Sequence, residues 1–172
     1  HGRYREAQHV HEDALRMSQE LRDEHGIAWA KAQLGEIAIL LGDYQRAWIY
    51  ERESLAIVMQ LGCQGLAAWR LSTCGFLLMI QGEYDSAETY FQQSLAIFQR
   101  LRHPEGWPAQ LLNLAELRWR TERIGEASAF LEKSRLLASP ALDHYFETWF
   151  CYTQSRISAA LGETTQAWAQ LF

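Results

Sequence analysis

The side chains best suited to chemistry in this sequence are its histidines, cysteines and glutamates, and their spacing assembles no catalytic or metal site. His9 and His11 lie two residues apart, which places them on different faces of a helix, whereas zinc ligands on one helix must share a face. The glutamates fit a solvated helix surface better than acid–base pairs: Glu51, Glu53, Glu83 and Glu88. We therefore expect no enzyme activity, no metal and no cofactor.

The cysteines and glycines also lack reactive patterns. Cys63, Cys74 and Cys151 are an odd number of cysteines at unrelated positions, which argues against a disulfide framework and for a reducing compartment. We expect Cys74 to be buried in the core. The glycines form no Gly-x-x-x-x-Gly-Lys phosphate loop and are spaced as helix terminators. These observations favour recognition over catalysis.

Composition excludes two classes of partner. The formal net charge is -5 without a long basic run, so the phosphate attraction that drives most nucleic-acid binding is missing. No apolar run approaches the roughly 20 residues that a membrane span needs. The first residues form a polar helical pattern rather than a signal peptide. We therefore expect a cytoplasmic protein that contacts neither nucleic acid nor membrane directly.

The feature that positions all other residues is a turn that recurs every forty residues. Residues 82–87 (GEYDSA) return as 42–47 (GDYQRA) and 2–7 (GRYREA), and less closely as 122–127 and 162–167. One alanine column holds in every copy: Ala7, Ala47, Ala87, Ala127 and Ala167. A period of this length indicates stacked supersecondary units that bury their apolar faces against their neighbours.

Each unit is predicted to be a pair of helices. The apolar spacing predicts helices over residues 2–24, 27–41, 44–61, 66–81, 84–101, 107–120, 123–138 and 140–161. Gly42 and Gly82 are typical helix ends, and Asp43 is a typical N-cap. Glu122 stands where other copies have glycine, so we expect an irregular turn there. The predicted fold is all-α: a right-handed α-solenoid of antiparallel helix hairpins.

The repeat divides the chain without an internal domain boundary. A single solenoid is expected over residues 1–172, with units 1–25, 26–64, 65–105, 106–139 and 140–172. The first unit lacks its first helix, and the last unit is partial. Such a pattern is typical of an excerpt from a longer solenoid, so further domains of the same polypeptide are among the expected partners.

The residues of each copy resemble the tetratricopeptide repeat, whose signature combines small residues at both helices with a Gly-x-Tyr turn. The copy 26–64 has Leu34, Gly35, Gly42, Tyr44, Ala47 and Ser54, and the copy 65–105 has Cys74, Gly75, Gly82, Tyr84, Ala87 and Ser94. The third copy keeps Leu114, Ala115, Ala127 and Ser134, and the fourth keeps Ser155, Gly162 and Ala167. The forty-residue spacing, longer than the usual unit of about 34, resembles kinesin light chains and bacterial transcription activators and signal-transduction ATPases.

Three functions follow from this resemblance. The first is a protein- or peptide-binding module of a larger bacterial regulatory protein, which holds an extended segment on its concave face. The second is a ligand-sensing domain that switches an attached DNA-binding or ATPase domain. The third is a structural scaffold that associates with itself end to end, because a solenoid cut within a repeat exposes apolar faces.

Small residues are expected where the two helices of a pair cross, because helices approach closely only without bulky side chains. The predicted crossing places Gly35, Gly75, Ala115 and Ser155 opposite Ala47, Ala87, Ala127 and Ala167.

The peptide groove is expected on the exposed face of each first helix, which lines the concave side of such a solenoid. Spacings of four and three define one trio on each first helix. The predicted groove residues are Trp29, Gln33, Glu36, Trp69, Thr73, Phe76, Asn113, Glu116, Trp149, Thr153 and Arg156; Ala109 completes the trio of helix 107–120 but is not counted as a groove residue.

Two columns run through these trios. The tryptophan column, Trp29, Trp69 and Trp149, offers burial for a partner. The polar column, Gln33, Thr73, Asn113 and Thr153, offers amide or hydroxyl hydrogen bonds to a peptide backbone. The alternatives are tryptophans that pack between repeats and a polar column that is merely solvated. The residues that flank this predicted groove, and are secondary candidates for binding, are Ser72, Leu112, Trp119, Arg120 and Tyr152.

Overall fold

The computed structural model describes residues 2–138 and 144–162, and every element in these ranges is a helix. The order is α1 (Gly2–Leu21), α2 (Glu24–Leu41), α3 (Tyr44–Gln60), α4 (Gln64–Gln81), α5 (Tyr84–Leu101), α6 (Gly106–Arg120), α7 (Ile124–Leu137) and α8 (His144–Ala160). The eight predicted helices are confirmed to within a few residues at their ends. The start of the predicted helix 140–161 lies partly outside the described residues.

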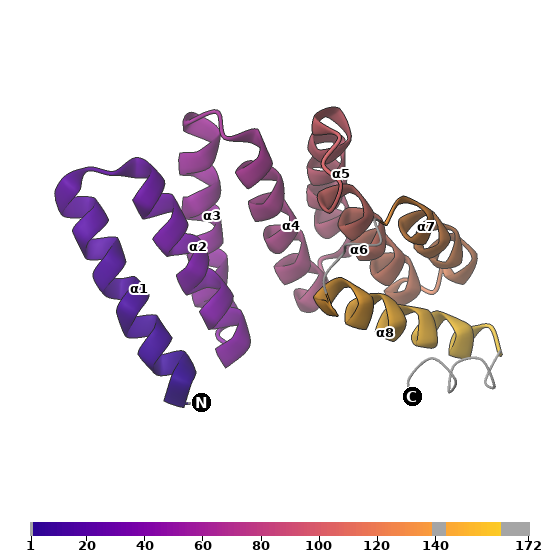
Figure 1. The fold of residues 1–172 in the computed structure, drawn as a ribbon. Coiled ribbons are helices and arrows are strands. Elements are labelled where there is room, and N and C mark those ends of the chain that lie inside the picture. The colour runs from indigo at the N-terminus through magenta and orange to yellow at the C-terminus, as the bar shows by residue number, and fades with distance from the viewer. Residues whose placement is uncertain (1, 139–143, 163–172) are drawn as a thin grey trace.

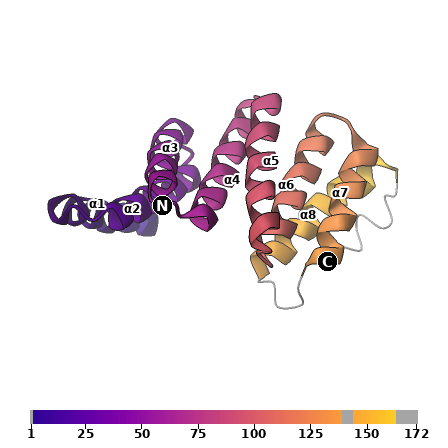
Figure 2. The same ribbon diagram turned by 90° about the horizontal axis from the view of Figure 1, so that it is seen from above.

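The helices form an α-solenoid of hairpins (Figure 1). α2 packs on α3, α4 on α5 and α6 on α7, and each hairpin then packs on the next through α3 with α4 and α5 with α6. Figure 2, seen from above, shows the same row from α1 to α7 with α8 beside α6 and α7. The all-α solenoid predicted from the repeat is therefore confirmed.

The first helices form one wall of the row, here called the inner wall: α2, α4, α6 and α8. α4 contacts α6 and α6 contacts α8, while no comparable contact joins α3 to α5 or α5 to α7 in the described parts of the chain. Among the described residues, α2 and α4 have no comparable contact either, so the closer approach of neighbouring first helices, and the curvature of the row towards them, holds for α4, α6 and α8. This is the concave side on which the sequence predicts a groove.

Residues with the left-handed backbone conformation (positive φ) end the helices at a regular interval. Gly42 (φ 79°) and Gly82 (φ 84°) have the conformation that glycine adopts without strain. Glu122 has φ 59°, so the turn that the sequence marks as irregular keeps the backbone conformation of the other copies. Further residues with positive φ are Arg22, Gly62, Arg102 and Gly162, so among the described residues one occurs at every twentieth position; position 142 lies outside them.

The closest crossing within a hairpin involves different partners from those predicted. A Cβ built on Gly35 would lie 2.7 Å from Oε1 of Glu51, and one built on Gly75 would lie 2.7 Å from Cε1 of Phe91. The nearest side chains are therefore one helical turn beyond the predicted alanines. Ala47, Ala87 and Ala127 are fully buried, and Ala167 lies outside the described residues.

A serine on each second helix also ties the hairpin together. Ser54 Oγ donates to the carbonyl oxygen of Ala28 at 2.7 Å, Ser94 Oγ to that of Ala68 at 2.7 Å, and Ser134 Oγ to that of Pro108 at 2.8 Å. All three serines are buried. The same bond thus recurs in every complete hairpin, because each partner lies at the same place in the repeat.

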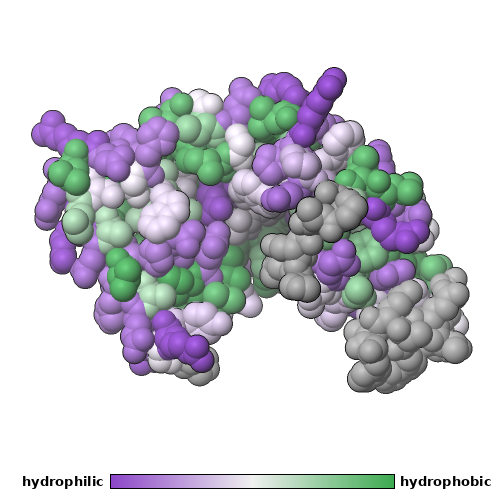
Figure 3. Space-filling model, viewed as in Figure 1, coloured by the Kyte–Doolittle hydropathy of each residue, from purple (hydrophilic) through white to green (hydrophobic). Residues whose placement is uncertain are grey.

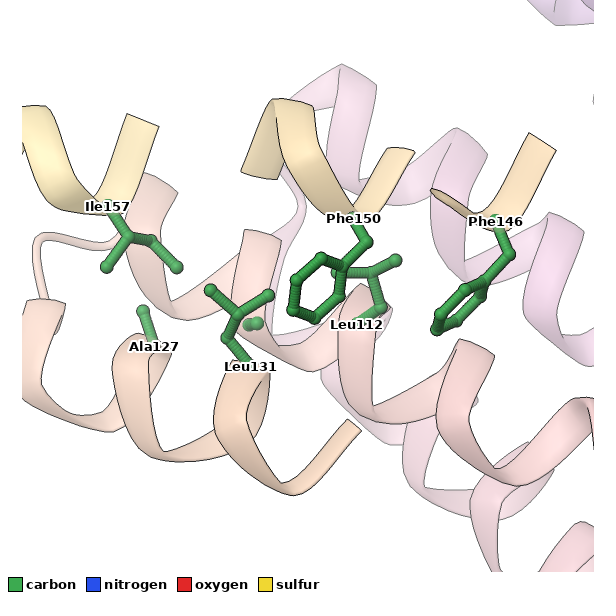
Figure 4. Packing of buried hydrophobic residues seen from close by; sticks show 7 residues of the cluster. Leu112, Ala127, Leu131, Phe146, Phe150 and Ile157 are labelled. Atoms are coloured by element: carbon green, nitrogen blue, oxygen red, sulfur yellow. The ribbon is translucent and has the colours of Figure 1, made fainter. Parts of the chain in front are cut away.

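Apolar clusters fill the spaces between successive hairpins. Figure 4 shows one of them, in which Phe146, Phe150 and Ile157 of α8 point towards Leu112 of α6 and Leu131 of α7. α8 therefore occupies, against α6 and α7, the position of a further first helix. Within the described ranges, no helix is both long and apolar enough to span a membrane.

Candidate functional site

Polar side chains link neighbouring first helices along the inner wall. Arg70 of α4 reaches Oε1 of Glu36 on α2 at 3.4 Å. Asn113 Nδ2 of α6 donates to Ser72 Oγ of α4 at 3.1 Å. Arg156 Nη1 of α8 lies 2.6 Å from Oε1 of Glu116 on α6. Several predicted groove residues therefore bind a neighbouring helix.

The predicted trio on α2 is the most accessible. Trp29 is 55% exposed, and its ring lies 5.2 Å from that of His11 on α1 in an edge-on contact. Glu36 is exposed and Gln33 is half-buried. These three side chains offer an apolar ring, an amide and a carboxylate to a partner.

The trio on α4 is partly engaged. Trp69 is half-buried, with its ring 4.9 Å from that of Phe98 and 6.0 Å from that of His103. Thr73 Oγ1 donates to the carbonyl oxygen of Trp69 within the helix at 3.2 Å. Phe76 is half-buried and packs on an apolar cluster of the second and third hairpins. Trp69 thus packs, through these ring contacts, on the second helix of its own hairpin and on the segment that follows it.

On α6 the prediction of an exposed groove face is wrong. Asn113 and Glu116 are both buried, because α4 and α8 cover this helix from two sides. Asn113 Nδ2 also donates to Gln110 Oε1 at 3.2 Å, and Glu116 Oε1 accepts from Arg120 Nε at 2.9 Å. The Asn113 amide nitrogen and Oε1 of Glu116 are therefore hydrogen-bonded between the helices, whereas the buried Oε2 of Glu116 has no hydrogen-bond partner among the described residues.

On α8 the predicted trio is divided. Thr153 is fully buried, so the prediction of its exposure is wrong, and its hydroxyl has no hydrogen-bond partner in the part of the chain that the structure describes. Its environment differs from that of Asn113, because Leu112 replaces Ser72 at the equivalent position of the preceding helix. Trp149 is half-buried against the apolar cluster formed by residues of α6, α7 and α8.

Arg156 is held at the edge of this wall by aromatic rings. Its guanidinium carbon lies 3.4 Å from the ring centre of Trp119 and 5.1 Å from that of Tyr152. Stacking of this kind together with the Glu116 ion pair fixes the side chain of the arginine. Tyr152 remains exposed.

The accessible part of the predicted surface consequently lies mainly on the first two inner helices. Its residues are Trp29, Gln33, Glu36, Thr73 and Phe76. Figure 3 shows polar and apolar side chains interspersed over the N-terminal half of the face in view. Such a surface suits a partner with mixed chemistry rather than a purely apolar ligand.

Sequence reasoning missed a buried ion pair. Glu51 is predicted to lie on a helix surface, but it is fully buried and pairs with Arg70 at 3.2 Å. Burial raises the pKa of Glu51 to about 7, against the opposing effect of Arg70. The signal was present in the repeat, since Glu51 aligns with the buried residues Phe91 and Leu131.

A second missed cluster joins the second and third hairpins. Arg118 of α6 is buried, and its Nη1 donates to Glu88 Oε2 of α5 at 2.9 Å. Its Nε lies 3.1 Å from Oε2 of Glu126 on α7. The hydrogen bonds from Arg118 lower the pKa of Glu88. This arginine connects three helices rather than forming an active centre.

Cys74 is buried as predicted, and burial raises the pKa of its thiol to about 12, which leaves it protonated and unreactive at neutral pH. Among the described residues, no group of three histidine, cysteine, aspartate or glutamate side chains has the geometry to hold a metal ion.

Comparison with known proteins agrees with this architecture. Residues 66–135 match the family model of the tetratricopeptide repeat. No curated protein matches the sequence.

Several solved structures share the fold at low sequence identity. BtubC (BKLC) from P. vanneervenii superposes with a TM-score of 0.79 at 20% identity, over 98% of this chain and 70% of that one. A kinesin light chain-like protein with nearly identical TPR-like repeats from Podospora anserina gives a TM-score of 0.69 at 20% identity, over 99% and 84% of the two chains. The apo form of RapI gives 0.82 at 17% identity, over 96% of this chain and 60% of RapI.

Proposed function

Because the chain is built from tetratricopeptide-type helix hairpins, we propose that it is a protein-interaction module that binds an extended peptide segment along the N-terminal part of its inner wall. Solenoids of this kind present extended concave surfaces to their partners. The accessible residues of α2 and α4 supply one large exposed ring, an amide, a hydroxyl and a carboxylate. These groups fit a peptide that needs apolar anchoring and backbone hydrogen bonds.

The observation that carries this proposal is the exposure of Trp29. It is the exposed member of the tryptophan column, while Trp69 and Trp149 are half-buried against helices. A tryptophan left in solvent on a concave wall is the kind of side chain that dominates binding energy at interfaces.

We expect Trp29→Ala to weaken binding of a selected peptide by roughly tenfold or more. Peptides would first be selected on the intact chain from a random library of extended segments, and their dissociation constants would then be measured by fluorescence anisotropy. The matched control is Ile49→Ala, which removes an exposed apolar side chain from the outer helix α3. Equal affinities for the wild type and Trp29→Ala, with unchanged folding by circular dichroism, would contradict the proposed groove.

We further propose that the module serves within a larger bacterial regulatory protein of the cytoplasm. RapI, which shares the fold, is a longer chain, of which this one covers 60%. Sequencing the full gene that encodes this chain tests the proposal directly, because an attached ATPase or DNA-binding domain would be encoded in the same reading frame. A full-length protein that ends within the helical repeats would contradict it.

A specific observation supports end-to-end association as a second function. α1 has no fully buried residue, and its stripe of Val10, Met17 and Leu21 is 63%, 59% and 76% exposed. The equivalents of Met17 in later hairpins, Ile57 and Ile97, are half-buried and pack against an apolar cluster. The α1 stripe can therefore pack on a second copy of the chain.

Met17→Glu is expected to abolish any such association, because a charge would then be buried in the contact. Light scattering coupled to size-exclusion chromatography at low and high protein concentration measures it. The control is Met59→Glu, which places the same charge on another exposed methionine. A wild-type mass equal to that of one chain at all concentrations would exclude self-association.

A further inference from the structure

Glu51 places a carboxyl group where the other hairpins have an apolar side chain. Its equivalents Phe91 and Leu131 are buried residues of the apolar core. Glu51 is itself 0% exposed, and its Oε1 is the atom nearest to a Cβ built on Gly35. The carboxyl group therefore lies at the crossing of α2 and α3.

The cation that pairs with this carboxyl group is the guanidinium of Arg70, which belongs to the next hairpin. Arg70 Nη1 lies 3.2 Å from each carboxylate oxygen of Glu51. The same guanidinium reaches Glu36 Oε1 at 3.4 Å through both Nη1 and Nη2. These distances exceed the roughly 2.7–2.9 Å of strong charge-assisted bonds. A single guanidinium is therefore shared between two carboxylates on two helices.

The remaining groups around Glu51 add little positive charge. α2 contributes the carboxylate of Glu36, and α4 contributes Arg70 and the buried thiol of Cys74. Lys31 of α2 is paired with Glu53 instead. Burial, followed by the attraction to Arg70 and the repulsion from Glu36, sets the pKa of Glu51 at about 7. Glu51 therefore exchanges its proton within the physiological range.

We propose that Glu51, Arg70 and Glu36, here called the charge trio, let one proton control the charge that the peptide groove presents at Glu36. This inference rests on the proposed peptide groove. With Glu51 ionised, two carboxylates share one guanidinium and the trio carries a net charge of one negative unit. With Glu51 protonated, Arg70 is left to Glu36 alone and the trio is neutral.

The charge of the trio therefore favours a peptide with a basic side chain at this point of the groove. The side chain of Glu36 is 47% exposed, so the negative charge of the trio is presented to solvent on the inner wall. A peptide with a lysine or arginine opposite Glu36 binds better when Glu51 is ionised. By linkage, binding of that basic side chain also lowers the affinity of Glu51 for its proton.

A site-resolved titration tests the trio. A short oligolysine peptide is added to the intact chain at pH 8 and at pH 6, and the carboxyl ¹³C signals of Glu36 and Glu51 are followed by NMR. We expect the apparent affinity at Glu36 to be roughly fivefold weaker at pH 6, the change that one unit charge at contact distance produces in water. The Glu51 signal should titrate near pH 7, and the peptide should move its midpoint down.

Two variants separate the trio from other effects of pH on binding. Glu51→Gln keeps the shape of the side chain without its charge, so affinity at Glu36 should be weak at both pH values. Glu83→Gln removes an exposed carboxylate elsewhere and should keep the wild-type response. Equal affinities at both pH values in the wild type, or no response of Glu36 to oligolysine, would overturn the charge trio. If peptides selected on the intact chain still required Trp29, the groove itself would stand.

Discussion

Gly75→Leu is expected to lower the free energy of unfolding by about 3 kcal/mol, because overpacking a tight helix crossing forces neighbouring groups to move. A Cβ at this position would lie 2.7 Å and 2.8 Å from two ring atoms of Phe91. Phe91 is fully buried in the cluster that joins the second and third hairpins, so its ring has no free space to enter. The α4–α5 hairpin would have to separate, and the Ser94 bond to α4 would lengthen with it.

The measurement is urea unfolding followed by circular dichroism, with Gly125→Leu as the matched control. Gly125 lies near the start of α7, and a Cβ built on it would meet no atom within 4 Å beyond its chain neighbours and the local helix backbone, among the residues that the structure describes. The same substitution there should be neutral or stabilise by up to about 0.8 kcal/mol through helix propensity. Equal effects of the two variants would show that Gly75 does not occupy a tight crossing.

The stability of the chain is also expected to fall between about pH 4.5 and pH 7 because of Glu51. Its pKa is raised from 4.5 to about 7 in the folded state, so the folded chain binds more protons than the unfolded chain in this window. Its protonated form therefore favours folding below pH 4.5, and that advantage is lost as the pH rises to 7. The shift corresponds to a loss on the order of 3 kcal/mol.

Glu51→Gln should flatten this part of the stability profile, which is measured by urea unfolding at intervals from pH 4 to pH 8. Glu132→Gln, at an exposed position of α7, is the control and should leave the slope unchanged. Glu88 acts in the opposite direction, because its lowered pKa adds stability that is lost on acidification below its ordinary range. A wild-type profile without a decline between pH 4.5 and 7, or one equal to that of Glu51→Gln, would refute the role of Glu51.

The repeat explains why the fold was predictable from the sequence. Each complete hairpin carries its own turn, its own small crossing residue and its own serine, so the same local sequence signals recur several times along the chain. Asp43 caps α3 as expected, accepting a hydrogen bond from the backbone N–H of Arg46 at 3.1 Å. Even Glu122, which departs from the pattern, adopts the left-handed conformation, because the packing of α6 on α7 determines the turn.

The candidate site was less predictable because equivalent positions have different surroundings. Gln33 is half-buried, whereas Asn113 and Thr153 are buried, although all three belong to one column. Exposure depends on how closely the next first helix approaches, and a single helix pattern does not encode that distance. Glu51 shows the same limit, since its burial is visible only when it is aligned with Phe91 and Leu131 and its partner Arg70 lies in another hairpin.

Residues with the left-handed backbone conformation recur every twenty positions in the described residues. One helix together with its turn is therefore the smallest repeating module of this chain. Gain or loss of a single module would exchange the roles of all later helices, so that residues shaped for the concave side would face outwards. Gain or loss of two modules preserves every role. Natural duplication and designed extension of this protein are therefore constrained to even numbers of helices, in steps of forty residues.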